Sequence, residues 1–139
     1  MNPYVVVKEF EKKLSEYTGA PYVVCVDSCT NAMFLICKRL GVEKTILPKQ
    51  TYLSIPMSII HAGGEVKFED REWSGMYQIK PYPIWDAAKR MRKDMYVEGS
   101  YMTLSFHVKK HLPIGKGGAI LCDNKEDYEW FRKARYGKN

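Results

Sequence analysis

Hydrophobic positions recur along the chain with a helical period in some segments and a strand pattern in others. The segment 3–17 has an apolar residue at every third or fourth position, which predicts an amphipathic helix. The β-branched run at 22–26 predicts a buried strand. A second helical pattern covers 31–40, and Gly41 is a suitable stop for it.

The same alternation continues to the end of the chain and predicts an α/β fold. Further strands are expected at 45–47, 66–68, 83–85, 101–106 and 118–122, and further helices at 52–61 and 126–136. Strand, helix and strand in succession are typical of βαβ units with right-handed crossovers. We therefore expect a mostly parallel sheet with helices on both faces. The segment from Glu69 to Lys80 loses this periodicity and is predicted to be a loop.

Size and composition indicate one reduced, cytoplasmic domain. The 139 residues suit a single unit, 1–139, with its own core. The four cysteines form no CxxC pair and no histidine stands at zinc-ligand spacing, so we expect free thiols and no metal site. Neither a signal peptide nor an apolar run of bilayer-spanning length is evident, so no membrane segment is expected.

The charge balance leaves two interpretations open. Lysine plus arginine number 22 against 16 acidic residues, which gives a net charge of +6. Such a balance favours phosphate-bearing or other anionic partners, but it also serves plain solubility. Two basic clusters raise the alternative of a small nucleic-acid-binding domain: Lys89, Arg90, Arg92 and Lys93, and Arg132, Lys133, Arg135 and Lys138.

Three segments follow predicted strands, where ligands bind in open α/β sheets. The first, 27–31, offers hydroxyls and amides at a helix N-terminus, which suits either a phosphate site or an ordinary N-cap. The second places Asp86 just past a buried strand, where it would either pair with a cation or cap the next turn. The third, 105–110, ends in Lys110, which would be an aldehyde-binding nucleophile or part of a solvated loop.

Taken together, the order of these motifs resembles the DegT/StrS sugar aminotransferases, which use pyridoxal phosphate and have fold type I. That family typically reads S-x-T-A-A, E-D-A-A-Q, S-F-x-x-x-K-x-L and G-E-G-G. The corresponding residues here are Ser28-Cys29-Thr30-Asn31-Ala32, Trp85-Asp86-Ala87-Ala88-Lys89, Ser105-Phe106-His107-Val108-Lys109-Lys110-His111-Leu112 and Gly115-Lys116-Gly117-Gly118. The resemblance runs from Phe10 to Gly137 and implies a truncated version of the family's large cofactor-binding domain, without the C-terminal domain.

The resemblance also implies a role for each matching residue. Lys110 would form a Schiff base with the cofactor and later move a proton. Asp86 would pair with the protonated pyridine nitrogen. The phosphate would be held by Thr30, Asn31 (through its backbone) and Ser105. Tyr52 would stack on the cofactor ring, although a core or helix-start aromatic is an equal interpretation.

Departures from the family pattern keep the function open. Lys89 stands where the family has glutamine, and it would either pair with the cofactor's phenolate oxygen or compete for Asp86. The resemblance implies a homodimer that moves an amino group from glutamate or glutamine to a nucleotide-linked keto sugar. The alternative is an inactive remnant that serves as a binding or dimerisation module.

Overall fold

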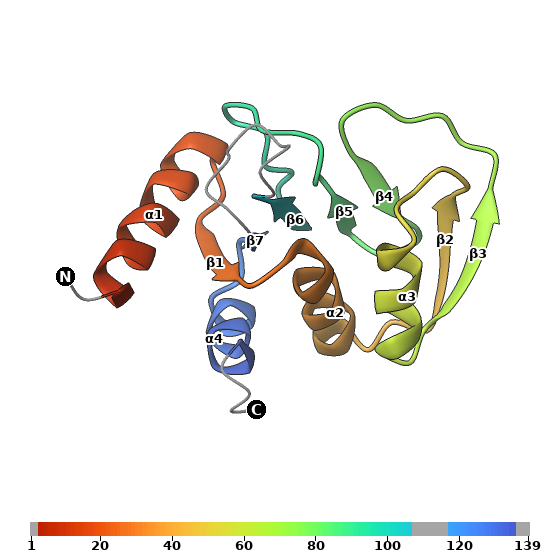
Figure 1. The fold of residues 1–139 in the computed structure, drawn as a ribbon, viewed down its shortest axis with the longest axis horizontal. Coiled ribbons are helices and arrows are strands. Elements are labelled where there is room, and N and C mark those ends of the chain that lie inside the picture. The colour runs from red at the N-terminus through yellow and green to blue at the C-terminus, as the bar shows by residue number, and fades with distance from the viewer. Residues whose placement is uncertain (1–2, 107–116, 136–139) are drawn as a thin grey trace.

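The chain alternates short strands with helices, which confirms the predicted α/β class. The structure is a computed structural model that describes residues 3–106 and 117–135 (Figure 1). Its elements are, in chain order, α1 (Pro3–Thr18), β1 (Tyr22–Val26), α2 (Cys29–Leu40), β2 (Lys44–Pro48), α3 (Ser54–His61), β3 (Glu65–Glu69), β4 (Tyr77–Ile79), β5 (Ile84–Asp86), β6 (Tyr101–Ser105), β7 (Gly118–Cys122) and α4 (Lys125–Ala134). Every helix in these two ranges is too short or too polar to cross a lipid bilayer.

The strands form a five-stranded sheet of order β1-β7-β6-β5-β4 and a two-stranded sheet of β2 and β3. Ile46 and Lys80 join the two sheets, because each donates its backbone N–H to the other's carbonyl, at 2.8 and 3.1 Å. Through these pairings β1, β2, β3, β5 and β6 all run in one direction, as expected of a mostly parallel sheet. The antiparallel strands β4 and β7 make the sheet mixed.

Strand β4 corrects the prediction of a loop from Glu69 to Lys80. Tyr77–Ile79 pairs with β5, and β3 extends to Glu69. Only two of the three residues in β4 are buried, Tyr77 and Ile79, so the alternating pattern is too short to stand out in the sequence. Hydrogen bonds from the backbone to neighbouring chain segments on both sides stabilise β4 as a strand, although so short a segment has little strand propensity of its own.

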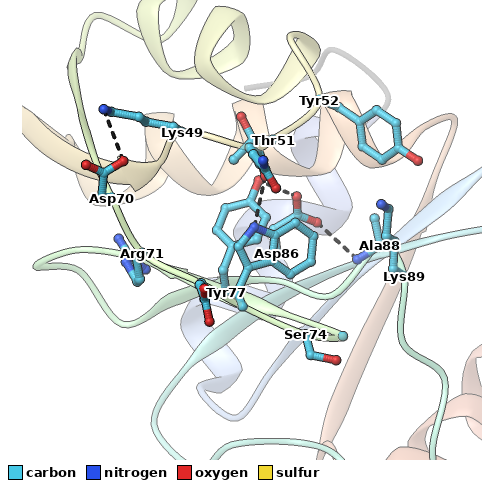
Figure 2. Close-up of a pocket in the computed structure, with 14 residues that line it drawn as sticks. Lys49, Thr51, Tyr52, Asp70, Arg71, Ser74, Tyr77, Asp86, Ala88 and Lys89 are labelled. Atoms are coloured by element: carbon cyan, nitrogen blue, oxygen red, sulfur yellow. Dashed lines mark hydrogen bonds and ion pairs between the residues drawn. The ribbon is translucent and has the colours of Figure 1, made fainter.

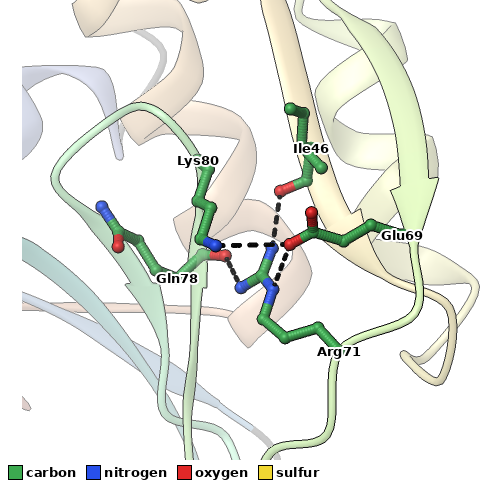
Figure 3. Close-up of polar contacts among 5 residues, drawn as sticks. All are labelled: Ile46, Glu69, Arg71, Gln78 and Lys80. Atoms are coloured by element: carbon green, nitrogen blue, oxygen red, sulfur yellow. Dashed lines mark hydrogen bonds and ion pairs between the residues drawn. The ribbon is translucent and has the colours of Figure 1, made fainter.

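One arginine ties three strands together at this join (Figure 3). The Arg71 guanidinium donates to the Glu69 carboxylate at 2.7 Å and to the backbone carbonyls of Gln78 and Ile46, at 2.7 and 3.0 Å. Lys80 Nζ lies 3.4 Å from the same Glu69 oxygen. The planar, many-donor guanidinium therefore holds β2, β3 and β4 in place at once.

Helices cover both faces of the sheet, as predicted. Successive strand residues point to opposite faces, so Val23 and Val24 belong to different core clusters. Helices α2, α3 and α4 pack on the face that includes Val24 and Ile120. Helix α1 packs on the other face through Leu14, and Figure 1 shows it apart from the other three helices.

A buried ion pair fastens α1 to the sheet and to the end of α4. Arg135 Nη1 lies 2.8 Å from Glu11 Oε2, and the two side chains are 8% and 11% exposed. The same Glu11 oxygen accepts the Cys25 N–H at 2.7 Å, while Arg135 donates to the Cys25 carbonyl at 3.1 Å. Residues distant in the sequence are thereby joined around β1.

Arg135→Met is predicted to lower the free energy of unfolding by about 3–5 kcal/mol, because it leaves the Glu11 carboxylate buried without that cation. Urea denaturation measures the loss. The control is Lys49→Met, since the Lys49–Asp70 pair is 60% and 89% exposed and should contribute less than about 1 kcal/mol. Equal losses in the two variants would contradict a special role for the buried pair.

Candidate functional site

One edge of the sheet gathers predicted site residues from several parts of the chain. Strands β1, β5 and β6 run in the same direction, so their carboxyl ends meet at this edge. Strand β5 ends at Asp86 and β6 at Ser105. Helix α2 begins beside them, because Cys29 Sγ lies 4.0 Å from Asp86 Oδ1.

The Asp86 carboxylate is buried and accepts hydrogen bonds from neutral donors. Its Oδ2 accepts the Tyr77 hydroxyl at 2.7 Å. Its Oδ1 accepts the Ala88 N–H at 3.0 Å and the Thr103 hydroxyl at 3.3 Å. Asp86 is only 3% exposed, and such donors offset the cost of removing a carboxylate from water.

Tyr77 is a site residue that the sequence reasoning missed, because it lies in the segment predicted to be a loop. Its backbone is directly opposite Asp86 in the antiparallel pair of β4 and β5. Burial and the Asp86 carboxylate raise the pKa of Tyr77, so its hydroxyl stays protonated and donates. The Trp73 ring packs on it, with ring centroids 4.7 Å apart.

A cavity of about 1140 Å³ opens beside Asp86 (Figure 2). The loops that follow β2, β3 and β5 supply its walls. Its lining includes Tyr52, Arg71, Trp73, Tyr77, Asp86 and Lys89. Aromatic rings, cations and one buried carboxylate therefore face the same space.

Lys89 lies between two aromatic rings at this cavity. Its ammonium is 5.1 Å from the centroid of Tyr52 and 5.5 Å from that of Trp73, within the range of cation–π attraction. Figure 2 shows Lys89 next to Ala88, on the side of the cavity where Tyr52 lies. Tyr52 and Lys89 are thus brought together near Asp86, while Trp73 is a further lining residue that the sequence did not indicate.

Of the predicted phosphate-binding residues, Thr30 and Asn31 lie at the start of α2 and Ser105 lies at the end of β6, and none of the three is among the residues that line this cavity. The helix begins two residues earlier than predicted, and its N-cap is Ser28, whose hydroxyl accepts the Asn31 N–H at 3.0 Å. Asn31 Nδ2 donates to Asp27 at 2.9 Å. The Thr30 side chain is exposed, and its carbonyl accepts the Ser58 hydroxyl at 3.2 Å.

Glycine is required where β7 passes this helix start. A Cβ on Gly118 would lie 2.6 Å from the Cys29 nitrogen and 2.8 Å from the Leu104 carbonyl oxygen, both backbone atoms. Gly118 also pairs with Ser105 across β6 and β7. The close approach of these backbones sets the distance between Ser105 and the N-terminus of α2.

Lys110 lies outside the described residues, as do Lys109 and Lys116. The described residues on either side are Phe106 and Gly117, and the Phe106 N–H donates to the Gly117 carbonyl at 2.9 Å. Phe106, directly after Ser105, and Gly117, directly before Gly118, are therefore adjacent to each other at this edge of the sheet.

The basic clusters are partly used in contacts within the protein. Lys89 faces the aromatic rings of the cavity, and Arg135 is in the buried pair with Glu11. The Arg90 guanidinium lies against Gly75, where any side chain would collide with it. Lys89, Arg90 and Arg135 are therefore engaged in contacts within the protein.

All four cysteines are free. Burial raises the pKa of Cys25, Cys37 and Cys122 to about 12 in each case. Those three thiols therefore stay protonated at neutral pH and are poor nucleophiles.

Comparison with known proteins gives one consistent family. A sequence profile of the DegT/DnrJ/EryC1/StrS aminotransferase family matches residues 2–95. The spore coat polysaccharide biosynthesis protein SpsC of Bacillus subtilis is 37% identical over 67 residues, which are 46% of this chain and 17% of SpsC.

Two solved structures have a similar fold. A putative sugar aminotransferase from Streptococcus pneumoniae, in its PLP form, is 19% identical with a TM-score of 0.76, and the match covers 96% of this chain and 50% of that one. DesI, determined in the presence of its TDP-sugar product, is 17% identical with a TM-score of 0.75, and the match covers 95% and 45% of the two chains. The chain therefore spans about half the length of these structures.

Proposed function

Because the chain belongs to the DegT/DnrJ/EryC1/StrS aminotransferase family, we propose that its cavity binds pyridoxal phosphate and that the protein acts in amino-group transfer. The observation that carries this proposal is the buried Asp86 carboxylate at the cavity wall. Tyr77, Ala88 and Thr103 donate hydrogen bonds to it, and an acceptor of this kind suits a protonated ring nitrogen. The cavity volume is ample for a cofactor of this size.

Each predicted residue has a part in holding the cofactor. Asp86 would accept from the ring nitrogen and keep it protonated, and the Tyr52 ring would stack on the cofactor. Lys89, which is already beside Tyr52, would pair with the phenolate oxygen. When bound, pyridoxal phosphate supplies an electron sink for the negative charge that develops during amino transfer.

The start of α2 and the end of β6 would hold the phosphate. Amide dipoles at a helix N-terminus attract anions, and Thr30 and Ser105 add hydroxyl groups. The Asn31 amide now donates to Ser28, so a phosphate at this position competes with the helix cap for that donor.

Lys110 would be the residue that attaches the cofactor covalently and carries the proton at its Nζ. It follows Phe106, which lies at the edge of the sheet where Asp86 and Ser105 are placed. A lysine that approaches the cofactor from this edge would be close to its target, and such proximity lowers the entropic barrier to reaction.

We propose a nucleotide-linked keto sugar as substrate, with glutamate or glutamine as amino donor, in the cytoplasm. The TDP-sugar product of DesI and the polysaccharide role of SpsC support this substrate class. The cavity offers Trp73 for apolar contact and Arg71 and Lys49 for anionic groups.

Borohydride reduction with pyridoxal phosphate is predicted to label Lys110, because reduction makes a lysine–cofactor attachment permanent. Mass spectrometry of peptides locates the added mass. Lys110→Ala should abolish the label, and the control Lys109→Ala should keep it. A label spread over many surface lysines, or none at all, would contradict the proposed cofactor site.

An unreduced sample of the same protein with pyridoxal phosphate, assayed beside the labelled one, separates an enzyme from an inactive binding module. Labelling of Lys110 together with amino transfer from glutamate to a nucleotide-linked keto sugar supports the enzyme. Labelling without turnover supports the binding module.

We further propose a homodimer that buries an apolar patch on α3 and β3. Leu53, Met57 and Ile60 recur at helical spacing and are 77%, 41% and 51% exposed. Phe68 of β3, a strand that α3 contacts, is also half exposed. An apolar patch of this kind on a small domain is typical of an interaction surface.

Ile60→Glu is predicted to convert the dimer to a monomer at micromolar concentration, because a carboxylate would be buried without a partner in the interface. Light scattering measures the mass. The control Val5→Glu, at an exposed position on α1, should remain dimeric. A monomer mass for the unmodified protein would refute the proposal.

A further inference from the structure

Tyr77 is placed against Asp86 by the register of the sheet and not by a flexible loop. The two residues are directly opposite in the antiparallel pair of β4 and β5, so their side chains lie on the same face. The Tyr77 hydroxyl donates to Asp86 Oδ2 at 2.7 Å. This hydrogen bond is shorter than those that the carboxylate accepts from Ala88 and Thr103.

The Tyr77 side chain has little freedom to leave this position. It is 3% exposed, and the Trp73 ring packs on its outer side. Trp73 is itself held by a hydrogen bond from its indole N–H to the Gln50 carbonyl at 2.9 Å. Strand β4 is held in turn by Arg71, which donates to the Gln78 carbonyl.

The described donors make the two oxygens of the Asp86 carboxylate unlike. Oδ1 accepts from Ala88 and Thr103 and has the Cys29 thiol at 4.0 Å, whereas Oδ2 accepts from Tyr77. A carboxylate held on both oxygens cannot rotate about its last bond without losing a donor. The direction of its remaining lone pairs is therefore fixed before any ligand arrives, which is preorganisation of the kind that binding sites use.

We propose that Tyr77 is a positioning residue that orients the Asp86 carboxylate toward a protonated ring nitrogen in the cavity. This inference rests on the proposed function, because it takes pyridoxal phosphate as the ligand. It adds a specific role for a tyrosine of β4. Tyr77 acts through Asp86 and donates its only hydroxyl proton to it.

If Tyr77 has this role, removing its hydroxyl should lower the affinity only for ligands that have a ring nitrogen. Tyr77→Phe keeps the ring and its packing on Trp73 but removes the donor to Asp86. Its affinity for pyridoxal phosphate should fall by about tenfold or more, because a carboxylate that is no longer oriented loses much of its charged hydrogen bond with the ring nitrogen. Its affinity for 1-deazapyridoxal phosphate, in which carbon replaces the ring nitrogen, should change by less than about twofold.

The measurement is an equilibrium titration of each ligand, followed by protein fluorescence, with the unmodified protein and each variant. Tyr82→Phe is the matched control, because its hydroxyl accepts from the Glu43 N–H and it is not among the residues that line the cavity. Tyr77→p-aminophenylalanine restores a donor at the same place and should restore the preference for the natural ligand. It also tests the inference if Tyr77→Phe proves unstable.

The possible outcomes distinguish this inference from the proposed function. Equal loss of both ligands in Tyr77→Phe would indicate a merely structural tyrosine and overturn the inference alone, as would no loss of either. If the unmodified protein binds neither ligand, the proposed function fails and the inference fails with it. Selective loss of pyridoxal phosphate with rescue by p-aminophenylalanine supports both.

Discussion

The burial of one carboxylate is the constraint on which the candidate site depends. Asp86 is placed inside the protein at the end of β5, where an ionised group without donors would be strongly unfavourable. Among the described residues, Tyr77 of β4, Thr103 of β6 and Ala88 in the turn after β5 donate hydrogen bonds to it. The packing of β4, β5 and β6 around the Asp86 carboxylate therefore determines the geometry of the site, and the cavity lies beside it.

The strand directions explain why so many chemically different groups lie at one edge. Five strands run the same way, so the segments after β1, β2, β5 and β6 all start from that edge. Strand β4 is antiparallel to these five strands, so it begins at the edge where they end. Its first residue, Tyr77, therefore lies at the same edge as Asp86. Arg71 is central to this arrangement, since it holds β4 against β2 and β3.

Most helices and strands and part of the candidate site can be predicted from the sequence. Strong apolar periodicity located the helices and most strands, and Asp86 was indicated by its place after a buried strand. Tyr77 and Trp73 were missed, because a three-residue strand has almost no period and its partner lies across a chain reversal. Several residues before α2 could have capped this helix. The structure identifies Ser28 as the N-cap, because its hydroxyl accepts the Asn31 N–H.

The most direct test of this account is a crystal structure of the protein with pyridoxal phosphate. The account predicts that the ring nitrogen lies about 2.7–3.2 Å from a carboxylate oxygen of Asp86, with the phosphate at the N-terminus of α2 and Tyr77 still bound to Asp86. A cofactor whose phosphate lies against Arg71 and Lys49, with its ring nitrogen facing away from Asp86, would contradict it.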